Sequence, residues 1–426
     1  MIETNKKIID KAILVAVKTK DISKERLEEH LLELEMLADT AGAETIIKIV
    51  QERQRFDSAY FIGKGKAEEI AELAELNDIT VIIFDEDLNP TQVRNLEKLI
   101  NKKILDRSGL ILDIFASHAK TNQAKTQVEL AQLQYMLPRL TRAWTHLSKQ
   151  YGGIGTKGPG ETQIETDRRI IRTRIAKLKE KLKKIESQQK TKSLGREDFI
   201  KVTLVGYTNA GKSTLLNLLT EAAVYAEDKL FATLDSTTRA LELTPKKRIL
   251  ITDTVGFIRK LPHHLVASFK TTLNVVKTAD LIIHVIDITN PFYEDHIQVV
   301  EETLESLGCK EKARLKIFNK IDALEDKHKL ELIKNHYPDS ILISAERGIN
   351  IKKLKDYFIK FYEQNFVENK IRTDHSRSHL VSKIHSLVED IETEYDDFGI
   401  TIKYRTTKQI HEQILRLLNG KKKTNN

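Results

Sequence analysis

The sequence has a single cysteine, Cys309, among 426 residues, which excludes an internal disulfide and a zinc site built from several cysteines. A lone thiol is typical of proteins in a reducing compartment. No apolar run is long enough to span a bilayer, and Met1–Lys7 leads into no signal sequence. Aromatic residues are scarce at 6%, whereas 31% of residues are charged, as in a soluble protein with much surface. We therefore expect a cytoplasmic location.

The excess of positive charge is also small. Lys and Arg number 70 against 62 Asp and Glu, which gives a formal net charge of +8. The places where basic residues concentrate are therefore more informative than the total. A chain of this length should contain about two to four domains and bury a sizeable core.

The stretch Gly206–Ser213 fits the pattern G-x-x-x-x-G-K-[ST] between a predicted strand at 199–205 and a predicted helix at 214–219. In that setting, backbone N–H groups and the positive helix end point at a phosphate. Lys212 would reach the β- and γ-phosphates, and the Ser213 hydroxyl would bind Mg²⁺. The alternative is a glycine turn with a surface lysine, but three further motifs follow in order. The predicted phosphate contacts are Gly206, Tyr207, Thr208, Asn209, Ala210, Gly211, Lys212 and Ser213.

Two further segments predict a switch controlled by the γ-phosphate. A strand at 248–252 ends in Asp253, Thr254, Val255 and Gly256. Asp253 would hold Mg²⁺ through water, and the Gly256 N–H would sense the γ-phosphate. The loop at 225–235 has no periodicity, and Thr233 in it is the candidate to complete the metal shell. We predict nucleotide contacts from Phe231, Ala232, Thr233, Leu234 and Asp235, and catalytic roles for Lys212, Thr233 and Gly256.

Phe257 occupies the position where Ras-like enzymes have a glutamine that orients water. A phenyl ring cannot orient a water molecule. The sequence therefore predicts slow hydrolysis that needs help from elsewhere.

The base-binding residues follow two later strands. Asn319, Lys320, Ile321 and Asp322 follow a strand at 314–318. A carboxylate there accepts both N–H groups of guanine, which adenine cannot supply, so the nucleotide is predicted to be GTP. After the last strand, at 340–343, come Ser344, Ala345 and Glu346, and the Ala345 N–H would bind the guanine carbonyl oxygen.

The rest of the chain predicts three more parts. Strand and helix patterns alternate through 8–115, which predicts a mostly parallel sheet. Two helices, Ala124–Leu137 ended by Pro138 and a basic one from about Thr162 to Gln189, flank the glycine-rich tip 151–160. The second helix carries an excess of Lys and Arg, which favours nucleic-acid contact over a merely solvated face. A hairpin at 388–405 between two helices predicts a small last domain before a basic tail, 421–426.

We therefore predict an α/β protein with four parts. These are an N-terminal α/β domain (1–116), an antiparallel helical arm (117–192), a P-loop GTPase domain with a mostly parallel sheet (198–366) and a small C-terminal α+β domain (367–426). Gly63-Lys64-Gly65-Lys66 precedes a helix in the first domain. It could bind an anion such as RNA phosphate or form an ordinary turn, and the sequence leaves both open.

The chain resembles the HflX family of GTPases, which are relatives of the Obg family. The resemblance rests on Tyr60–Lys66, Val128–Leu133 and Gly152–Thr162, together with the nucleotide motifs, including Asp253–Ile258. It implies a GTPase that binds the large ribosomal subunit and its RNA, extends its arm toward the peptidyl-transferase centre and splits stalled or idle ribosomes under stress. We expect a monomer off the ribosome. Ser236 departs from the family, which usually has proline there, and the last sixty residues match more weakly.

Two other assignments remain open. A GTPase for subunit assembly or RNA modification would use the same switch, and a signalling GTPase would have protein partners only. Asn209 lies where potassium-activated relatives carry an asparagine that binds the ion. The sequence leaves two roles open for this side chain: it could bind K⁺ as a second cofactor beside Mg²⁺, or it could simply brace the turn.

Overall fold

A computed structural model describes residues 9–140, 163–193, 199–220, 230–231, 233–245, 247–260, 275–324, 326–364, 366–388, 390–396 and 398–418. The glycine-rich tip, the basic tail and most of the switch loop before residue 230 lie outside these ranges. The chain forms two compact units. The first comprises Met1–Ile185, Glu227–Asp235 and Lys260–Thr271, and the second comprises Glu186–Ala226, Ser236–Arg259 and Thr272–Asn426. In the ranges given above, none of the helices combines the length and the apolar character that a membrane crossing needs.

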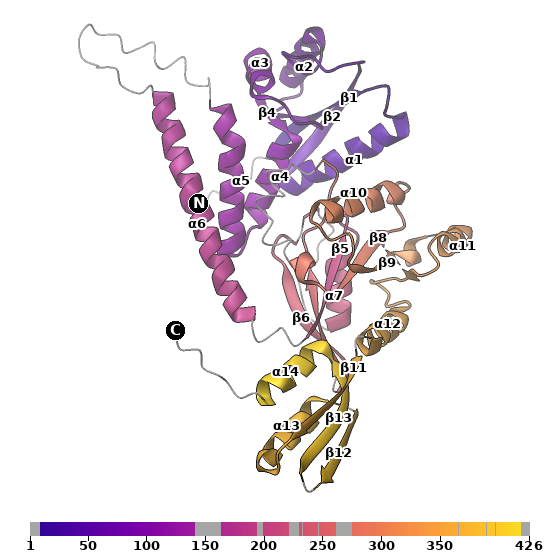
Figure 1. Cartoon of the computed structure of the whole chain (residues 1–426). Coiled ribbons are helices and arrows are strands. Elements are labelled where there is room, and N and C mark those ends of the chain that lie inside the picture. Colours follow the sequence, from indigo (N-terminus) through magenta and orange to yellow (C-terminus); the bar gives the residue numbers. More distant parts are fainter. Residues whose placement is uncertain are drawn as a thin grey trace, which may run out of the picture. The chain divides into compact units, whose positions relative to one another are not determined.

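The first unit contains a four-stranded parallel sheet in the order β2-β1-β3-β4 (Figure 1). Ser23 caps the first helix by accepting a hydrogen bond from the N–H of Arg26, and Pro90 is the first residue of α3. The predicted parallel sheet is therefore confirmed. Its elements are β1 (Asp10–Lys18), α1 (Lys24–Ala41), β2 (Ala43–Glu52), α2 (Lys64–Leu76), β3 (Val81–Phe84), α3 (Pro90–Ile100), β4 (Lys103–Asp106) and α4 (Arg107–His118).

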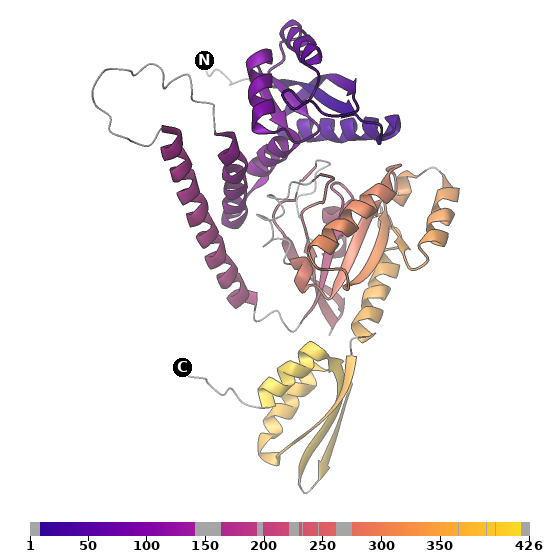
Figure 2. The same cartoon turned by 45° about the horizontal axis from the view of Figure 1, so that its top comes forward.

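Two long helices follow, α5 (Asn122–Arg139) and α6 (Gln163–Ser193). They lie side by side in both views (Figures 1 and 2), and Leu130 packs with Leu178 and Leu182 between them. The helices are antiparallel, because Arg174 pairs with Glu129 whereas the later Lys181 reaches the earlier Asn122.

The prediction that Pro138 ends the first of these helices is wrong. The helix α5 continues through Pro138 and ends at Arg139. A proline so close to the end removes only one N–H from the ladder of hydrogen bonds, so the last turn tolerates it.

The nucleotide domain in the second unit has a six-stranded sheet in the order β10-β9-β8-β5-β7-β6. All neighbours are parallel except β6, which is an antiparallel edge strand. Its elements are β5 (Ile200–Gly206), α7 (Lys212–Thr220), β6 (Thr237–Thr244), β7 (Lys247–Asp253), β8 (Leu281–Asp287), α10 (Tyr293–Ser306), β9 (Ala313–Asn319), the 3-10 turn η3 (Ile321–Ala323), α11 (Lys327–His336), β10 (Ile341–Leu342) and α12 (Ile351–Gln364).

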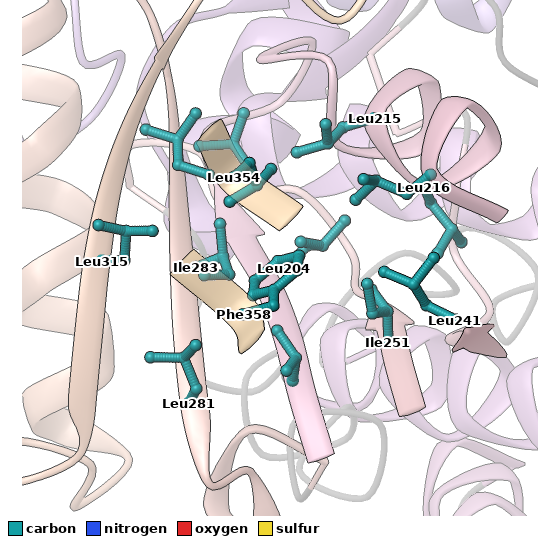
Figure 3. Packing of buried hydrophobic residues seen from close by; sticks show 14 of the residues in the cluster. Leu204, Leu215, Leu216, Leu241, Ile251, Leu281, Ile283, Leu315, Leu354 and Phe358 are labelled. Atoms are coloured by element: carbon teal, nitrogen blue, oxygen red, sulfur yellow. The ribbon is translucent and has the colours of Figure 1, made fainter. Parts of the chain in front are cut away.

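The core of this domain lies between the sheet and its helices. Leu204 and Ile283 on neighbouring strands meet Leu354 and Phe358 of α12, and all four side chains are buried (Figure 3). His284 in β8 is also buried, and burial lowers its pKa to about 3, with nearby Lys316 acting in the same direction. It is therefore a neutral histidine of the core.

The C-terminal part of the second unit is a three-stranded antiparallel sheet in the order β11-β13-β12. Ile384 and Ile414 on its two helices pack on Ile400 and Ile402 of the central strand. The predicted hairpin is confirmed, and the sequence reading missed β11. The elements are β11 (Phe366–Thr373), η4 (His375–Arg377), α13 (Ser378–Leu387), β12 (Asp390–Asp396), β13 (Gly399–Thr407) and α14 (Lys408–Leu418).

Candidate functional site

The loop between β5 and α7 has the backbone that a phosphate site needs. Gly206 and Gly211 have φ angles of +157° and +88°, and Asn209 has +61°. A Cβ on Gly206 would lie 2.2 Å from the carbonyl oxygen of Val285, and one on Gly211 would lie 2.3 Å from the side-chain nitrogen of Asn319. Only glycine fits these two positions. The loop therefore turns tightly back, as the loops that bind phosphate do.

Lys212 lies inside this loop. Its Nζ donates to the carbonyl oxygens of Gly206 and Tyr207 at 3.1 and 2.7 Å. Burial lowers the pKa of Lys212 to about 8, and the carboxylate of Asp253 acts in the opposite direction. A cation buried at the end of a strand is costly unless negative charge lies beside it. The phosphates of a nucleotide would supply that charge.

The two predicted metal-binding groups of the second unit are adjacent. Ser213 in the first turn of α7 donates its hydroxyl to Oδ2 of Asp253 at 2.6 Å, and Asp253 at the end of β7 is fully buried. A hydroxyl and a carboxylate are hard oxygen ligands of the kind that Mg²⁺ prefers. The donor set therefore fits one Mg²⁺, as the sequence predicts.

The segment after Asp253 is bound to the phosphate loop along its backbone. Phe257 donates its N–H to Gly206 at 3.0 Å and accepts one from Thr208 at 2.8 Å. The chains approach so closely at Gly256 that a Cβ there would lie 2.7 Å from the Cα of Thr208. Thr254 is buried and Val255 is nearly so. The Phe257 ring is only 2% exposed, so it occupies the core.

Tyr207 extends this connection with its side chain. Its hydroxyl accepts a hydrogen bond from the N–H of Arg259 at 3.0 Å. Its ring stacks on His296 of α10, with centroids 3.7 Å apart and an interplanar angle of 4°. Tyr207 therefore fixes the segment after Gly256 from one side while α10 fixes Tyr207 from the other.

The predicted base-binding residues also converge. Asn319 donates from its amide to the carbonyl of Ala210 at 2.9 Å and accepts from the N–H of Ala345 at 2.9 Å, so it joins the phosphate loop to the last loop. Ser344 is buried, and its hydroxyl accepts from the N–H of Arg347 at 3.0 Å. Glu346 next to them is exposed.

Asp322 is the predicted acceptor for the base. The Asp322 side chain is 9% exposed, Oδ2 lies 3.5 Å from Nε of Arg347, and Oδ1 makes no hydrogen bond to any described residue. Lys320 has a φ of +66° and pairs with Asp287 at 2.7 Å, while Ile321 opens the 3-10 turn that carries Asp322. A carboxylate held this way can accept two N–H groups from guanine.

The predicted switch residues belong to the first unit, apart from Ala232, which lies outside the described residues. Phe231 has a φ of +57° and packs edge-on against Phe115 with ring centroids 4.7 Å apart. Asp235 accepts from the N–H and the hydroxyl of Thr121 at 3.2 and 2.5 Å. Leu234 is buried, and Thr233 between these anchors is half-buried. The structure thus brings together Ser213 and Asp253, while Thr233 is held on α4 and the start of α5.

The glycine–lysine motif of the first domain forms the start of α2. Gly63 is the N-cap, and its N–H donates to the side chain of Gln51 at 2.8 Å. Lys64 and Lys66 pair with Glu68 and Glu69 on the same helix. These contacts favour the ordinary turn over an anion site.

Three contributors to the site carry weak or no sequence signals. Asp287, the partner of Lys320, carries a weak sequence signal, because it is an acid at the carboxyl end of a buried strand. Arg347 lies two residues after Ala345, so its proximity to the motif is a weak indication. His296 lies within a helix and could not be assigned to Tyr207 without the fold.

Three family descriptions match successive parts of the chain. Residues 28–116 match "GTP-binding GTPase N-terminal", residues 118–196 match "GTP-binding GTPase Middle Region", and residues 201–320 match "50S ribosome-binding GTPase".

Curated relatives cover most of the chain. GTPase HflX of Caldanaerobacter subterraneus subsp. tengcongensis is 44% identical over 95% of this chain and 93% of its own length. GTPase HflX of Escherichia coli is 43% identical over 88% of this chain and 89% of its own length. A crystal structure of a GTP-binding protein from Sulfolobus solfataricus in complex with GDP is 26% identical and covers 82% of this chain and 98% of that one, with a TM-score of 0.44.

Proposed function

The chain belongs to the HflX family of GTPases, and on this basis we propose that it binds the large ribosomal subunit in its GTP form and separates stalled or idle ribosomes under stress. The observation that carries the proposal is the combination of a guanine-nucleotide site with a basic antiparallel helical arm in one chain. We further propose that residues 1–116, 117–192, 198–366 and 367–426 act as the four functional parts.

In the proposed site the phosphate loop and Lys212 hold the β- and γ-phosphates, and Asp322 with the N–H of Ala345 holds guanine. Ser213, Thr233 and Asp253 hold Mg²⁺, which when bound neutralises charge on the phosphates. The Gly256 N–H contacts the γ-phosphate, so its loss on hydrolysis releases this segment and the Thr233 loop.

We propose that hydrolysis is slow in the free protein. Phe257 occupies the core and has no group that could position the attacking water. The ribosome would then supply the missing positioning, so that turnover is coupled to binding. This proposal predicts stimulation that survives Phe257→Ala better than Lys212→Ala, because only the lysine contacts phosphate.

The arm supplies the contact with ribosomal RNA. Leu178 and Leu182 face α5, which leaves the basic side chains on the remaining surface of α6. Eight of these side chains are exposed, namely Arg169, Arg172, Arg174, Lys177, Lys179, Lys181, Lys183 and Lys184. A row of cations along one helix pair fits a phosphate backbone.

Co-sedimentation with purified large subunits tests the proposal. We expect binding with a non-hydrolysable GTP analogue and much less with GDP. Neutralising Arg168, Arg169, Arg172 and Arg174 should weaken binding and flatten its salt dependence by up to about one unit of slope per lost phosphate contact. Neutralising Lys352 and Lys353 on α12 is the matched control. Deleting residues 151–160 should leave GTP binding intact and abolish splitting.

Other outcomes would favour the alternatives. Accumulation of precursor ribosomal RNA on deletion of the protein, without any splitting in vitro, would favour an assembly or RNA-modification GTPase. Absence of any ribosome binding with either nucleotide would favour a signalling GTPase whose arm is solvated surface.

A further inference from the structure

The hairpin of β12 and β13 presents two aromatic side chains to solvent. Phe398 at the turn is 84% exposed and Tyr395 beside it is 66% exposed. In both views the hairpin extends past the end of α13 (Figures 1 and 2). Aromatic side chains are scarce in this sequence, and a fully exposed phenyl ring contributes nothing to its own domain.

The turn that carries these rings is held from several sides. The carboxylate of Asp396 accepts the N–H of Phe398 at 2.9 Å and a hydrogen bond from Arg372 at 2.8 Å to each oxygen. The backbone carbonyl of Asp396 is bonded to the ring of His375 at 2.7 Å. A Cβ on Gly399 would lie 2.5 Å from the carbonyl oxygen of Thr373. The backbone beneath Phe398 is thus preorganised, which lowers the entropy cost of binding through this ring.

The strand leading to the turn is acidic. No lysine or arginine interrupts the run from residue 389 to residue 397, which contains Glu389, Asp390, Glu392, Glu394, Asp396 and Asp397. Lys403 on β13 pairs with Glu394 at 2.8 Å and lies 3.8 Å from Glu392, and Asp374 adds another exposed carboxylate. The local charge is therefore opposite in sign to the charge of the chain as a whole, which is +8.

We infer that this acidic hairpin tip, Tyr395 and Phe398 with the carboxylates of β12, docks on a basic protein that offers an apolar pocket for the rings. Exposed aromatic anchors surrounded by charge are the usual centre and rim of a protein interface. Acidic side chains steer the hairpin toward a positively charged surface. The inference rests on the proposed function for its partner, which is a protein of the large ribosomal subunit, since proteins bound to RNA carry excess positive charge.

Stacking of the rings on unpaired RNA bases is the competing use of such a tip. The net charge disfavours it, because the six acids of residues 389–397 outnumber Lys403 and Arg372, so phosphates that approach Phe398 are repelled. The basic α6, in contrast, has the charge that RNA requires. The two surfaces would therefore contact different components of one particle.

Site-specific photo-cross-linking tests the inference with the full-length protein, purified large subunits and a non-hydrolysable GTP analogue. With p-benzoylphenylalanine in place of Phe398, we expect an adduct with a ribosomal protein. The same substitution at Leu76, which is 80% exposed on α2, should not give that adduct. In parallel, Tyr395→Ser with Phe398→Ser should weaken subunit binding about tenfold, since anchors of this kind dominate interface affinity. Leu76→Ser is the control for this double variant. Binding of the double variant to large-subunit RNA stripped of its proteins should equal that of the unmodified protein.

An adduct with RNA, or subunit binding that is unchanged in the double variant, would overturn the inference while leaving the proposed function intact. Failure of the unmodified protein to bind large subunits with the GTP analogue would remove both. Fluorescent-GDP affinity of the double variant should equal that of the unmodified protein, which shows that the nucleotide domain remains folded.

Discussion

The two parallel sheets of this protein use the carboxyl ends of their strands in opposite ways. In the N-terminal domain, Asp85 follows β3 and Asp106 ends β4, and both are buried. Arg107 donates to Asp85 at 2.9 Å and also pairs with Glu33, while Asp106 pairs with Arg139 at 2.6 Å. Asp106 further accepts from the hydroxyl of Tyr135 at 2.6 Å. Burial and the Asp106 carboxylate raise the pKa of Tyr135, so this hydroxyl stays a donor.

The nucleotide domain leaves its strand ends open to a ligand. Asn319 joins two loops, and Oδ1 of Asp322 makes no hydrogen bond within the described part of the chain. Within the described part of the chain, the Nζ of Lys212 donates to the carbonyl oxygens of Gly206 and Tyr207 rather than to a carboxylate. A carboxylate at a strand end is therefore insufficient evidence of a ligand site. A carboxylate held by a buried arginine, as Asp85 is by Arg107, forms a structural ion pair, whereas Asp322, whose neighbour Arg347 is 70% exposed, can still take a ligand.

The largest effect expected from this comparison is on nucleotide specificity. Asp322→Asn should lower GTP affinity by roughly 10² to 10⁴, because guanine's N–H groups lose their carboxylate. Xanthine nucleotides should gain affinity, since xanthine offers an acceptor where guanine has a donor. Displacement of fluorescent GDP by GTP, XTP and ATP measures this. Asp85→Asn, the same change at the other sheet, should leave nucleotide affinity within about twofold. Equal displacement by ATP and GTP in the unmodified protein would contradict the assignment.

In the N-terminal domain, where the carboxylates at the strand ends are ion-paired, we expect substitutions to lower stability rather than nucleotide affinity. Arg107→Met should cost about 3–5 kcal/mol of unfolding free energy, because Glu33 and Asp85 lose the buried arginine that they share, although Asp85 keeps Lys260 at 3.4 Å. Urea unfolding measures the loss. The control is Lys103→Met, which breaks an exposed pair with Asp113 and should change the free energy of unfolding by less than about 0.5 kcal/mol. Combining Arg107→Met with Asp85→Asn and Glu33→Gln should recover much of the loss. An unchanged unfolding midpoint in Arg107→Met would mean that the ion pairs do not hold this sheet edge.

The sequence predicted one of these sheet ends far better than the other. The convergence of Lys212, Asp253 and Asn319 was predictable because each belongs to a motif that needs its residue type at the end of a strand or at the start of the helix that follows. The buried cluster around Arg107 was not, because its partners Glu33 and Asp85 lie on separate elements whose packing no local pattern encodes. No local pattern separates the strand β4 from the helix α4, since Asp106 is both the last residue of β4 and the N-cap of α4, with no loop between them. The contact of Asp235 with Thr121 likewise depends on tertiary structure.

A smaller effect, on the rate of GTP hydrolysis, should follow from removing a hydrogen bond between the phosphate loop and the segment after Gly256. Tyr207→Phe removes the hydrogen bond to Arg259 but keeps the ring that stacks on His296. Loss of one hydrogen bond of about 1 kcal/mol predicts roughly fivefold slower single-turnover GTP hydrolysis, with GDP affinity within about twofold. Tyr293→Phe, which removes a hydroxyl beside Glu294 on α10, is the control. Turnover equal to that of the unmodified protein would show that Arg259 needs no such support.

The smallest expected effect is that of K⁺, bound through Asn209 in the phosphate loop, on the rate of GTP turnover. Asn209 lies in the turn of the phosphate loop with a φ of +61°, a conformation that asparagine tolerates. Its amide oxygen could bind K⁺ beside the β- and γ-phosphates and place positive charge where other GTPases use an arginine. Ser236, in place of the family's proline, makes the neighbouring loop less constrained, so the gain should be modest. We expect turnover in KCl to exceed that in NaCl at equal ionic strength by roughly threefold, since one solvated charge contributes less than about 1 kcal/mol. Asn209→Ala should abolish the difference, whereas equal rates in both salts, or a difference that persists in the variant, would leave Asn209 as a brace of the turn.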